Sequence, residues 1–387
     1  MKISSVEALW LSVPLPADKQ HRSDFGQIRT FDSVLVRVRT DDGLVGYGEA
    51  KPAVGSSGSG AALVAIVTQE LAPQLVGQDA AQIGALHARM RNGVRAELAL
   101  RAGRPMPILG RRGVHMAAIA GVDLALWDLA GKAHDCPVLA LVGGACRASI
   151  PAYASGGWAG EAEIGAELGR YVEQGFRAVK MRIGAMDGGA RASLGRVGAA
   201  RKALGPALAL MVDAHGTLGV AEGKRFCAAA AEHDLRFVEE PVASDDRAGL
   251  AELRRSSSLP IAAGESESSC FDFAELCERR ALDVLQPDLA IAGGFSEGQR
   301  IAALAWARRL ELAPHCWGSA ISFQAARTLA LASPAGTFVE VPMGGAPLLR
   351  ELAPIDLALH EGALLPPQGP GWGVEPDPAF LARHARS

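Results

Sequence analysis

The sequence predicts an α/β protein: a (β/α)8, TIM-like barrel joined to an α+β capping domain that the N-terminal region and the C-terminal tail form together. Two observations lead to this fold class. From residue 150 onward, short apolar segments alternate with helical segments, which is typical of parallel α/β structure. Polar and charged residues recur at the ends of the apolar segments, where a barrel carries its catalytic groups.

Eight short apolar segments are the predicted barrel strands. They span Ile150–Ser155, Ala178–Ile183, Leu208–Ala214, Arg236–Glu239, Ile261–Glu265, Val284–Asp288, Leu312–His315 and Phe338–Val341. The helices predicted between them span Glu161–Gln174, Ala190–Leu204, Ala221–His233, Asp246–Ser256, Phe271–Arg280, Phe295–Arg309 and Ser319–Leu331. The alternative is an open, doubly wound sheet. It requires a glycine fingerprint at the first strand-to-helix turn, and we find none in the sequence.

Three of these strands end on an acidic residue at a regular interval. Asp213, Glu239 and Glu265 follow one another 26 residues apart, which is the length of one strand and its returning helix. Their carboxylates would therefore meet at one rim and repel one another unless a hard divalent cation neutralised them. The sequence thus predicts a Mg²⁺ site. The alternative is three acids on separate solvated loops.

The first 115 residues have a different pattern. Ile3–Val13 and Asp32–Glu49 alternate like antiparallel strands, and the second segment contains an Asp42-Gly43 hairpin turn. A long helix is predicted over Arg112–His134. We therefore divide the chain into a capping domain (residues 1–115), a catalytic barrel (116–341) and a C-terminal return (342–387) that packs on the capping domain through a strand at Ile355–Leu359.

Two polar segments of the capping domain are candidates for substrate contact. Asp18–Arg29 is too long for a tight turn, and it supplies His21 and Arg22 as candidate substrate-binding residues. The second segment, Ser56–Ser59, is rich in glycine and serine but lacks the Gly-Lys-Ser or Gly-Lys-Thr of a phosphate-binding loop. Plain surface is the alternative for the first segment, and for the second we prefer a loop at the edge of a pocket to a nucleotide site.

The composition excludes several classes of protein. The 387 residues are 49% hydrophobic and 21% charged, which is enough to bury a large core. The net charge of −3 gives no basic surface for nucleic acid or for a membrane, so we expect a small-molecule partner. The six cysteines form no CxxC pair or disulfide framework, and we find neither a signal peptide nor a stretch long enough to span a bilayer. These features favour a cytoplasmic protein.

Taken together, the predicted strand ends collect one set of polar residues. In chain order these are Lys180, Arg182, Asp213, His215, Glu239, Glu265, Asp288, His315 and Glu340. Residues two apart in a strand point to the same side, so Lys180 and Arg182 share a face. Such a set would be costly in a core that served stability alone, because buried charges must be paired.

Ordered motifs around these residues resemble the enolase superfamily, in its mandelate racemase-like branch. The resemblance covers nearly the whole chain. It rests on Val45-Gly-Tyr-Gly-Glu49, Val179-Lys-Met-Arg-Ile-Gly184, Met211-Val-Asp-Ala-His215, Val238-Glu-Glu-Pro241, Ala263-Gly-Glu265, Gln286-Pro-Asp288 with Gly293-Gly294, and Ala313-Pro-His315. Each motif alone is weak, but the ordered set is specific.

The resemblance implies Mg²⁺ held by Asp213, Glu239 and Glu265, and abstraction of the proton next to a substrate carboxylate. His315 is the base that it implies, and Asp288 fixes the tautomer of its ring and makes it more basic. A satisfied core histidine is the alternative for His315, and the presence of Asp288 one strand earlier weakens it. The acid at the end of the last strand, Glu340, either donates a hydrogen bond to the substrate or is a plain rim acid. The family also implies a homo-oligomer.

One position departs from the pattern of many family members. They carry Lys-x-Lys, with the second lysine as a base, whereas this chain has Lys180-Met-Arg182. A guanidinium stays protonated, so Arg182 can hold a carboxylate but cannot abstract a proton. This weakens a two-base racemase, although Lys180 would serve as the second base if its pKa were depressed.

His215 adds a candidate acid two residues after a metal ligand. One base and one acid suit the elimination of water from a polyhydroxy acid, so we predict an acid-sugar dehydratase, a carbon–oxygen lyase. The other role open to His215 is a hydrogen bond to the metal-binding residues. A racemase or epimerase of a 2-hydroxy acid is the alternative function. A non-catalytic barrel is a third hypothesis, against which the three acids argue.

Overall fold

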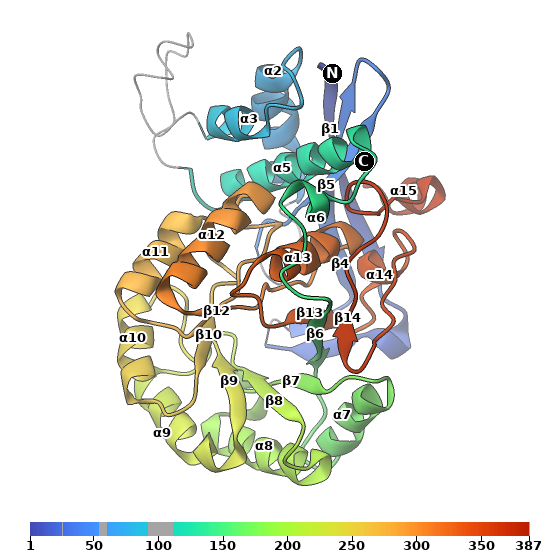
Figure 1. The fold of residues 1–387 in the computed structure, drawn as a ribbon. Helices are drawn as coiled ribbons and strands as arrows, with labels where there is room; N and C mark the ends of the chain where they lie inside the picture. Colours follow the sequence, from blue (N-terminus) through green and yellow to red (C-terminus); the bar gives the residue numbers. More distant parts are fainter. Residues whose placement is uncertain (25, 54–59, 92–110, 387) are drawn as a thin grey trace.

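The structure is a computed structural model that describes residues 1–24, 26–53, 60–91 and 111–386 (Figure 1). Its larger part is a curled parallel sheet of eight strands. They are β6 (Ile150–Gly156), β7 (Ala178–Arg182), β8 (Ala209–Asp213), β9 (Leu235–Glu239), β10 (Ile261–Ala263), β11 (Val284–Leu285), β12 (Glu311–Leu312) and β13 (Val339–Pro342). All eight predicted strands are present, with ends that differ by up to three residues.

The order of these strands makes the sheet a barrel. Neighbours run β12-β11-β10-β9-β8-β7-β6-β13, so the two ends of the path are the seventh and eighth strands of the barrel. A parallel bridge between Leu312 and Gly336 joins those two ends, with hydrogen bonds from Leu312 N to Ala335 O and from Thr337 N to Leu312 O, both 2.9 Å. The predicted closed barrel is confirmed, and the open sheet is excluded.

Helices connect successive strands and form the outer layer (Figure 1). They are α7 (Ile164–Glu173), α8 (Ala190–Leu204), α9 (Val220–Ala230), α10 (Arg247–Ser256), α11 (Cys270–Glu278), α12 (Phe295–Arg308) and α13 (Ala320–Ala332). Each matches a predicted helix. Short turns η3 (Ala185–Asp187) and η4 (Ala231–His233) complete two of the connections.

The barrel interior has an apolar layer and a charged layer. Tyr153 packs edge-on against Phe237 and Phe338, with ring centroids 6.2 and 6.1 Å apart, and buried Ala178 and Met211 lie in the same cluster. Side chains alternate along a strand, so two residues after Ala178 the chain again points inward, at Lys180. The apolar layer thus closes the barrel beneath the charged strand ends.

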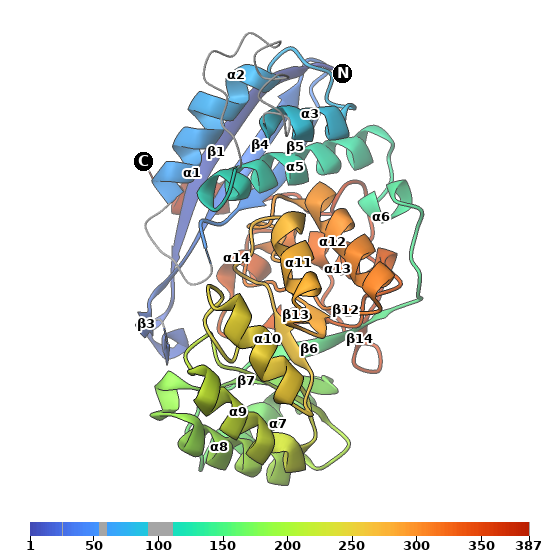
Figure 2. The same cartoon turned by 90° about the vertical axis from the view of Figure 1, so that its left-hand side faces the viewer.

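An antiparallel sheet forms the second part of the molecule. Its strands β1 (Ile3–Pro14), β4 (Thr30–Thr40) and β5 (Val45–Ala50) are ordered β1-β4-β5. Between β1 and β4, a short turn η1 (Ala17–Lys19) precedes a small hairpin of β2 (His21–Ser23) and β3 (Gly26–Ile28), which reaches from the sheet toward the barrel (Figure 2).

Helices cover this sheet. They are α1 (Gly60–Ala65), η2 (a π-helix, Ile66–Leu71), α2 (Ala72–Leu75), α3 (Ile83–Met90) and α5 (Val114–Ala133), followed by the short α6 (Val138–Leu141). The N-terminal sheet shares one apolar core with α1, η2, α2, α3 and α5, to which α5 contributes most of its length, whereas α6 packs on α5 and α13. This part is the α+β capping domain. The division at residues 115 and 341 stays a prediction.

Helix α5 is long and apolar enough, by length and composition alone, to cross a membrane. This differs from our expectation that no stretch of the sequence would be. In the structure, 78% of the apolar stretch of this helix is buried. It packs against β5 on one side and against the barrel helix α12 on another. Its apolar surface is therefore covered by the protein itself.

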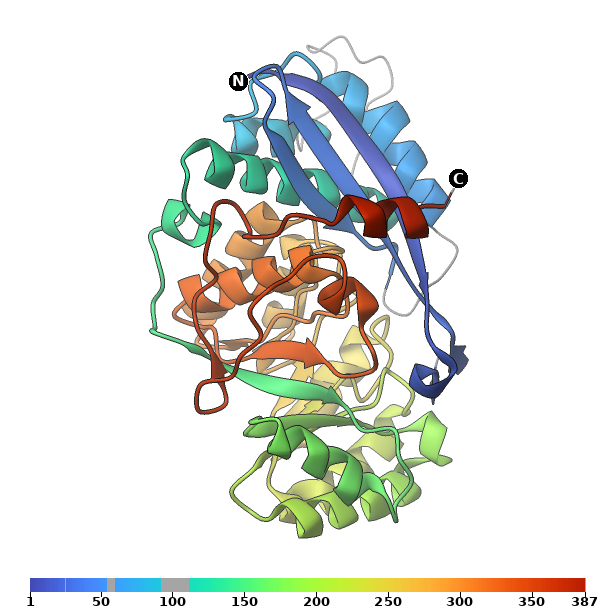
Figure 3. The ribbon, with the colours of Figure 1, turned by 90° about the vertical axis from the view of Figure 1, so that its right-hand side faces the viewer.

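The C-terminal return contacts both parts of the molecule (Figure 3). Its helix α15 (Pro378–His384) lies against β1, and Arg386 N donates to Trp10 O at 2.8 Å. The predicted strand at Ile355–Leu359 was wrong: this segment has no strand pairing, and the carbonyl of Asp356 instead accepts from Arg327 of α13. The return also contains the short α14 (Pro347–Arg350), and its strand β14 (Ala363–Leu364) pairs with β6 of the barrel.

Candidate active site

Parallel register brings the predicted metal ligands together. Arg182 pairs with Asp213 across β7 and β8, and Asp213 pairs with Glu239 across β8 and β9. Glu265 follows β10 by two residues, on the next strand of the sheet. The equal spacing along the chain therefore becomes adjacency at one rim.

The three acids form a compact, buried cluster. Ligand oxygens of Asp213, Glu239 and Glu265 all lie within 4.8 Å of one another. Among the described residues, Asp213 Oδ2 and Glu265 Oε2 accept no hydrogen bond, although both are buried. Buried carboxylate oxygens that lack hydrogen bonds are suited to a hard cation such as Mg²⁺, so these residues fit a metal site.

Lys180 lies at the centre of this cluster. Its Nζ is 2.5 Å from Glu239 Oε1, 3.0 Å from Glu340 Oε1 and 3.4 Å from Asp213 Oδ2, and the side chain is fully buried. Burial would lower the pKa of Lys180, but the carboxylates of Glu239 and Glu340 raise it above its usual range. These carboxylates oppose the depressed pKa that a Lys180 base would require, and the role of Lys180 stays a prediction.

Arg182 flanks the cluster on the side of β7. Its guanidinium forms an ion pair with Asp213 and lies over the indole ring of Trp317, 5.5 Å from the centroid. Stacking and an ion pair both hold the planar group in one orientation. Arg182 thus presents a fixed positive charge beside the predicted metal ligands.

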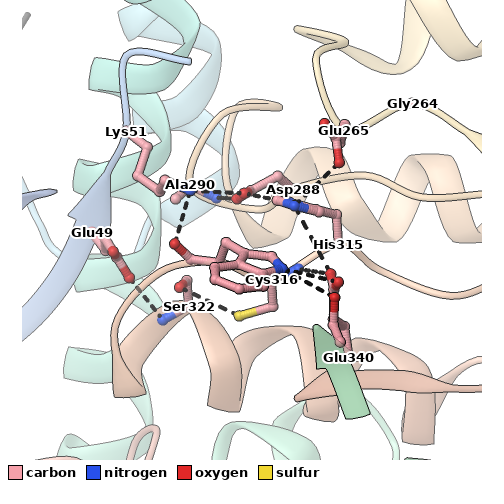
Figure 4. Close-up of polar contacts among 12 residues, drawn as sticks. Glu49, Lys51, Gly264, Glu265, Asp288, Ala290, His315, Cys316, Ser322 and Glu340 are labelled. Carbon is pink, nitrogen blue, oxygen red and sulfur yellow. Dashed lines mark hydrogen bonds and ion pairs between the residues drawn. The ribbon is translucent and has the colours of Figure 1, made fainter. Parts of the chain in front are cut away.

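His315 and Asp288 form a buried pair on the opposite flank (Figure 4). His315 Nδ1 lies 2.9 Å from Asp288 Oδ2, and the other ring nitrogen, Nε2, lies 3.2 Å from Glu265 Oε2. Burial would lower the pKa of His315, but Glu265, Glu340 and Asp288 raise it. This arrangement is the one expected of a base whose tautomer is fixed by a carboxylate.

A capping-domain lysine that sequence reasoning missed contacts this pair. Lys51 follows β5, and its Nζ donates to Trp317 O at 3.0 Å and lies 3.7 Å from Asp288 Oδ2 (Figure 4). Burial alone would raise the pKa of Asp288, but Lys51 and the hydrogen bond from His315 lower it. Lys51 therefore helps to keep Asp288 ionised. Its position two residues after Glu49 in the sequence gave no signal of this contact.

Glu340 faces the centre of the barrel from β13. It accepts hydrogen bonds from Cys316 N at 2.9 Å and Trp317 Nε1 at 3.1 Å, in addition to its ion pair with Lys180. Burial would raise the pKa of Glu340, but Lys180 and His315 lower it. Glu340 is thus an ionised acceptor in this structure, so it would need a proton to donate to a substrate.

His215 contacts the capping domain. Its Nδ1 lies 2.9 Å from Asp24 Oδ2, and its Nε2 lies 3.5 Å from Asp213 Oδ2. Burial and the charge of Arg182 lower the pKa of His215 to about 4, against the effect of Asp24. The sequence places Asp24 in the polar segment before β3 but gives no sign that it meets His215, 191 residues away.

The structure thus brings most of the predicted residues together at the carboxyl ends of the barrel strands. The exceptions are the substrate-binding candidates. Backbone positions of His21 and Arg22 are described in β2, but their side chains, like residues 56–59, lie outside the described part of the chain. Trp317 was also missed, and its half-buried indole contacts Arg182, Glu340 and Phe31. Its place two residues after His315 was the available signal.

The site is a cluster of carboxylates beside a histidine–aspartate pair at the end of a barrel. Comparison of the sequence with known protein families shows which class of proteins has this fold and site. Residues 6–143 match the mandelate racemase / muconate lactonizing enzyme N-terminal domain. Residues 163–380 match the enolase C-terminal domain-like family. The chain therefore belongs to the enolase superfamily, in the mandelate racemase / muconate lactonizing enzyme family.

Several relatives are similar over most of their length. A D-galactonate dehydratase of Ralstonia nicotianae is 34% identical over 366 residues, which cover 92% of this chain and 91% of the relative. A D-galactarolactone cycloisomerase of Agrobacterium fabrum is 31% identical over 355 residues, 88% of each chain.

Solved structures agree with the fold. A member of the enolase superfamily from Polaromonas sp. superposes with a TM-score of 0.89 at 30% identity, over 100% of this chain and 98% of that one. A racemase from Streptomyces coelicolor with bound magnesium gives a TM-score of 0.86 at 30% identity, over 99% of this chain and 100% of that one.

Proposed function

We propose that this protein is a Mg²⁺-dependent dehydratase of an acid sugar, an aldonate or aldarate. The observation that carries the proposal is the presence of two histidines on opposite flanks of the acidic cluster. His315 Nε2 approaches Glu265 and His215 Nε2 approaches Asp213, each with its Nδ1 against an aspartate. A base on one side and an acid on the other is the arrangement that elimination of water requires.

Asp213, Glu239 and Glu265 would hold the Mg²⁺. When bound, the ion supplies positive charge that stabilises the enediolate formed next to the substrate carboxylate. Lys180 and Arg182 add fixed positive charges beside the same position. The bound magnesium of the Streptomyces coelicolor racemase supports this choice of metal.

The proton transfers follow from the side chains. His315 Nε2 takes the proton from the carbon next to the carboxylate, and Asp288 keeps the ring in the orientation that leaves Nε2 free for it. The electron pair of that C–H bond is first delocalised into the enediolate, and it then forms the C=C bond as the C–O bond of the β-hydroxyl breaks. His215, when both ring nitrogens are protonated, gives the proton on Nε2 to the departing oxygen, which leaves as water. The enol product then tautomerises to a 2-keto-3-deoxy acid.

A substrate screen tests the function. The purified protein would be incubated with Mg²⁺ and a set of hexonates, pentonates, aldarates and their lactones, and 2-keto acids would be detected with semicarbazide. Because relatives are named D-galactonate dehydratase and D-galactarolactone cycloisomerase, D-galactonate and the galactarate lactone are included. Formation of a 2-keto-3-deoxy acid supports the proposal; a folded protein that converts none of them contradicts it.

A racemase or epimerase of a 2-hydroxy acid is the second candidate. The lowered pKa of His215 favours it, because a neutral imidazole can accept a proton on the face opposite His315. Deuterium incorporation from D₂O with inversion at the α-carbon and without loss of water would support this function over dehydration. The expected homo-oligomer and cytoplasmic location stay predictions, and light scattering of the purified protein tests the first.

A further inference from the structure

The contact between Asp24 and His215 joins two distant parts of the chain. Asp24 comes from the capping domain, between β2 and β3, whereas His215 follows the barrel strand β8. Their side chains are each 3% exposed and meet at 2.9 Å. The second carboxylate oxygen of Asp24 accepts from Met186 N at 2.8 Å, in η3 of the barrel. Asp24 is thus held by two barrel loops at once.

The backbone fixes where the ring of His215 lies. His215 has a φ of +45°, a left-handed conformation that non-glycine residues adopt at a cost, and its N–H donates to Asp213 Oδ1 at 2.9 Å. The backbone therefore holds the ring of His215 beside the acidic cluster. Its direction is then set by the bond to Asp24, with Nε2 toward Asp213.

The same geometry occurs twice in the site. In both histidines Nδ1 lies 2.9 Å from an aspartate Oδ2, and in both Nε2 faces a carboxylate of the acidic cluster. The source of the aspartate differs. Asp288 belongs to the barrel, but Asp24 belongs to the capping domain.

We propose that Asp24 is a positioning residue for His215. Its carboxylate keeps a hydrogen on Nδ1 of the ring and so directs Nε2 at the reacting group. An ionised carboxylate can only accept a hydrogen bond, so the ring nitrogen that faces it must carry the hydrogen. Asp24 is suited to this role because the hydrogen bonds from His215 and from Met186 N lower its pKa, although burial would raise it.

This inference rests on the proposed function in one respect: the ring, which keeps its hydrogen on Nδ1, takes up a second proton on Nε2 and delivers that second proton to the departing hydroxyl. It follows that the two histidine–aspartate pairs serve different steps: the His315 pair removes the α-proton, and the His215 pair protonates the departing hydroxyl. The His315 pair lies within the barrel, whereas the His215 pair is complete only when the segment around Asp24 is docked on η3. Removal of the α-proton should therefore be less sensitive to Asp24 than departure of the hydroxyl.

The tautomer of His215 can be measured without any substrate. Protein labelled with ¹⁵N-histidine is examined by long-range ¹H–¹⁵N NMR, and His215→Asn assigns the signal. We expect the Nδ1–H form in the wild type and loss of that preference in Asp24→Ala, with the preference kept in Asp24→Glu. Asp41→Ala is the matched control, since Asp41 is an exposed carboxylate of the same domain that accepts a hydrogen bond from Lys2 N. An unchanged His215 signal in Asp24→Ala overturns the proposal.

The second measurement separates the two halves of the reaction, with D-galactonate as the probe. In Asp24→Ala we expect kcat for dehydration to fall about 10–100-fold, the range for residues that orient a catalytic ligand, with a smaller change in α-proton exchange from D₂O. A 3-fluoro analogue, whose leaving group needs no proton, should restore elimination in the variant. Equal loss of exchange and dehydration, without restored elimination from the 3-fluoro analogue, contradicts positioning of His215. If the wild type converts no acid sugar, the proposed function fails, while the NMR experiment still decides the role of Asp24.

Discussion

Lys180 is a buried cation that pairs with carboxylates of the active site. Its ammonium lies among the carboxylates of Asp213, Glu239 and Glu340, so it neutralises part of the charge that the acidic cluster concentrates at the rim. Buried ion pairs contribute little net stability, but removal of one partner leaves uncompensated charge. Lys180 therefore supports the fold as well as the proposed chemistry.

We predict that Lys180→Met destabilises the protein by about 3–5 kcal/mol in metal-free buffer, and by less when Mg²⁺ is present. Denaturant unfolding with and without Mg²⁺ measures both values. Lys202→Met, which removes an exposed lysine from α8, is the matched control and should change stability by less than about 0.5 kcal/mol. If the two variants lose the same stability, Lys180 does not compensate the cluster.

His315 is the residue on which both candidate functions depend. We predict that His315→Asn lowers α-proton exchange with D₂O by about 10²–10⁴-fold, because Nε2 of the base is lost while a side chain of similar shape remains. NMR of an acid-sugar substrate identified by the screen measures the exchange. The control His360→Asn changes an exposed histidine in the C-terminal return. Retention of exchange in His315→Asn would remove this residue as the base.

At the scale of elements, strand β5 and helix α5 are packed at backbone distance. A Cβ on Gly48 would lie 1.9 Å from Gly121 O, and one on Gly46 would lie 2.2 Å from Ala125 O. Only glycine permits this approach, and β5 itself carries Glu49 and is followed directly by Lys51. The buried carboxylate of Glu49 then accepts from Ser319 N and Ser319 Oγ, at the start of α13. The contact of β5 with α5 thus sets how the capping domain meets the barrel.

We predict that Gly48→Ala destabilises the protein by about 1–3 kcal/mol, the usual cost of overpacking, or by more. Gly84→Ala is the control. Gly84 lies in α3, and a methyl group on its Cα would have no neighbour within 4 Å, so alanine there should stabilise by up to about 1 kcal/mol through helix propensity. Thermal unfolding of both variants measures the difference. A Gly48→Ala protein as stable as the wild type would contradict the close approach.

At the scale of the whole molecule, the acidic cluster links metal binding to folding. Asp213, Glu239 and Glu265 meet only in the closed barrel, so an ion that they bind together stabilises the folded state over the unfolded chain. The chain in its unfolded state has no such arrangement.

We predict that Mg²⁺ at 100 times its Kd raises the free energy of unfolding by about 2.7 kcal/mol. Thermal melts in EDTA and in increasing Mg²⁺ measure the effect. Glu239→Gln should lose it, whereas Glu278→Gln, an exposed glutamate at the end of α11, should keep it. No increase in Tm with Mg²⁺ would exclude the proposed metal site.

The sequence alone determined the barrel, the positions of its strand ends and the membership of the acidic cluster. These features are local or periodic: apolar alternation predicts strands and helices, and equal spacing places Asp213, Glu239 and Glu265 on consecutive strands. The C-terminal return was less predictable, because the alternation at residues 355–359 resembled a strand while no sheet edge paired with it.

Only the tertiary structure decided which residues complete the site from a distance. Asp24 meets His215, and Lys51 meets Asp288, across sequence separations that no motif spans. The charge states were also decided there, because the pKa of Lys180 depends on carboxylates from β8, β9 and β13 that only folding brings within a few ångströms. Electrostatic interactions act through space, and the sequence records only order along the chain.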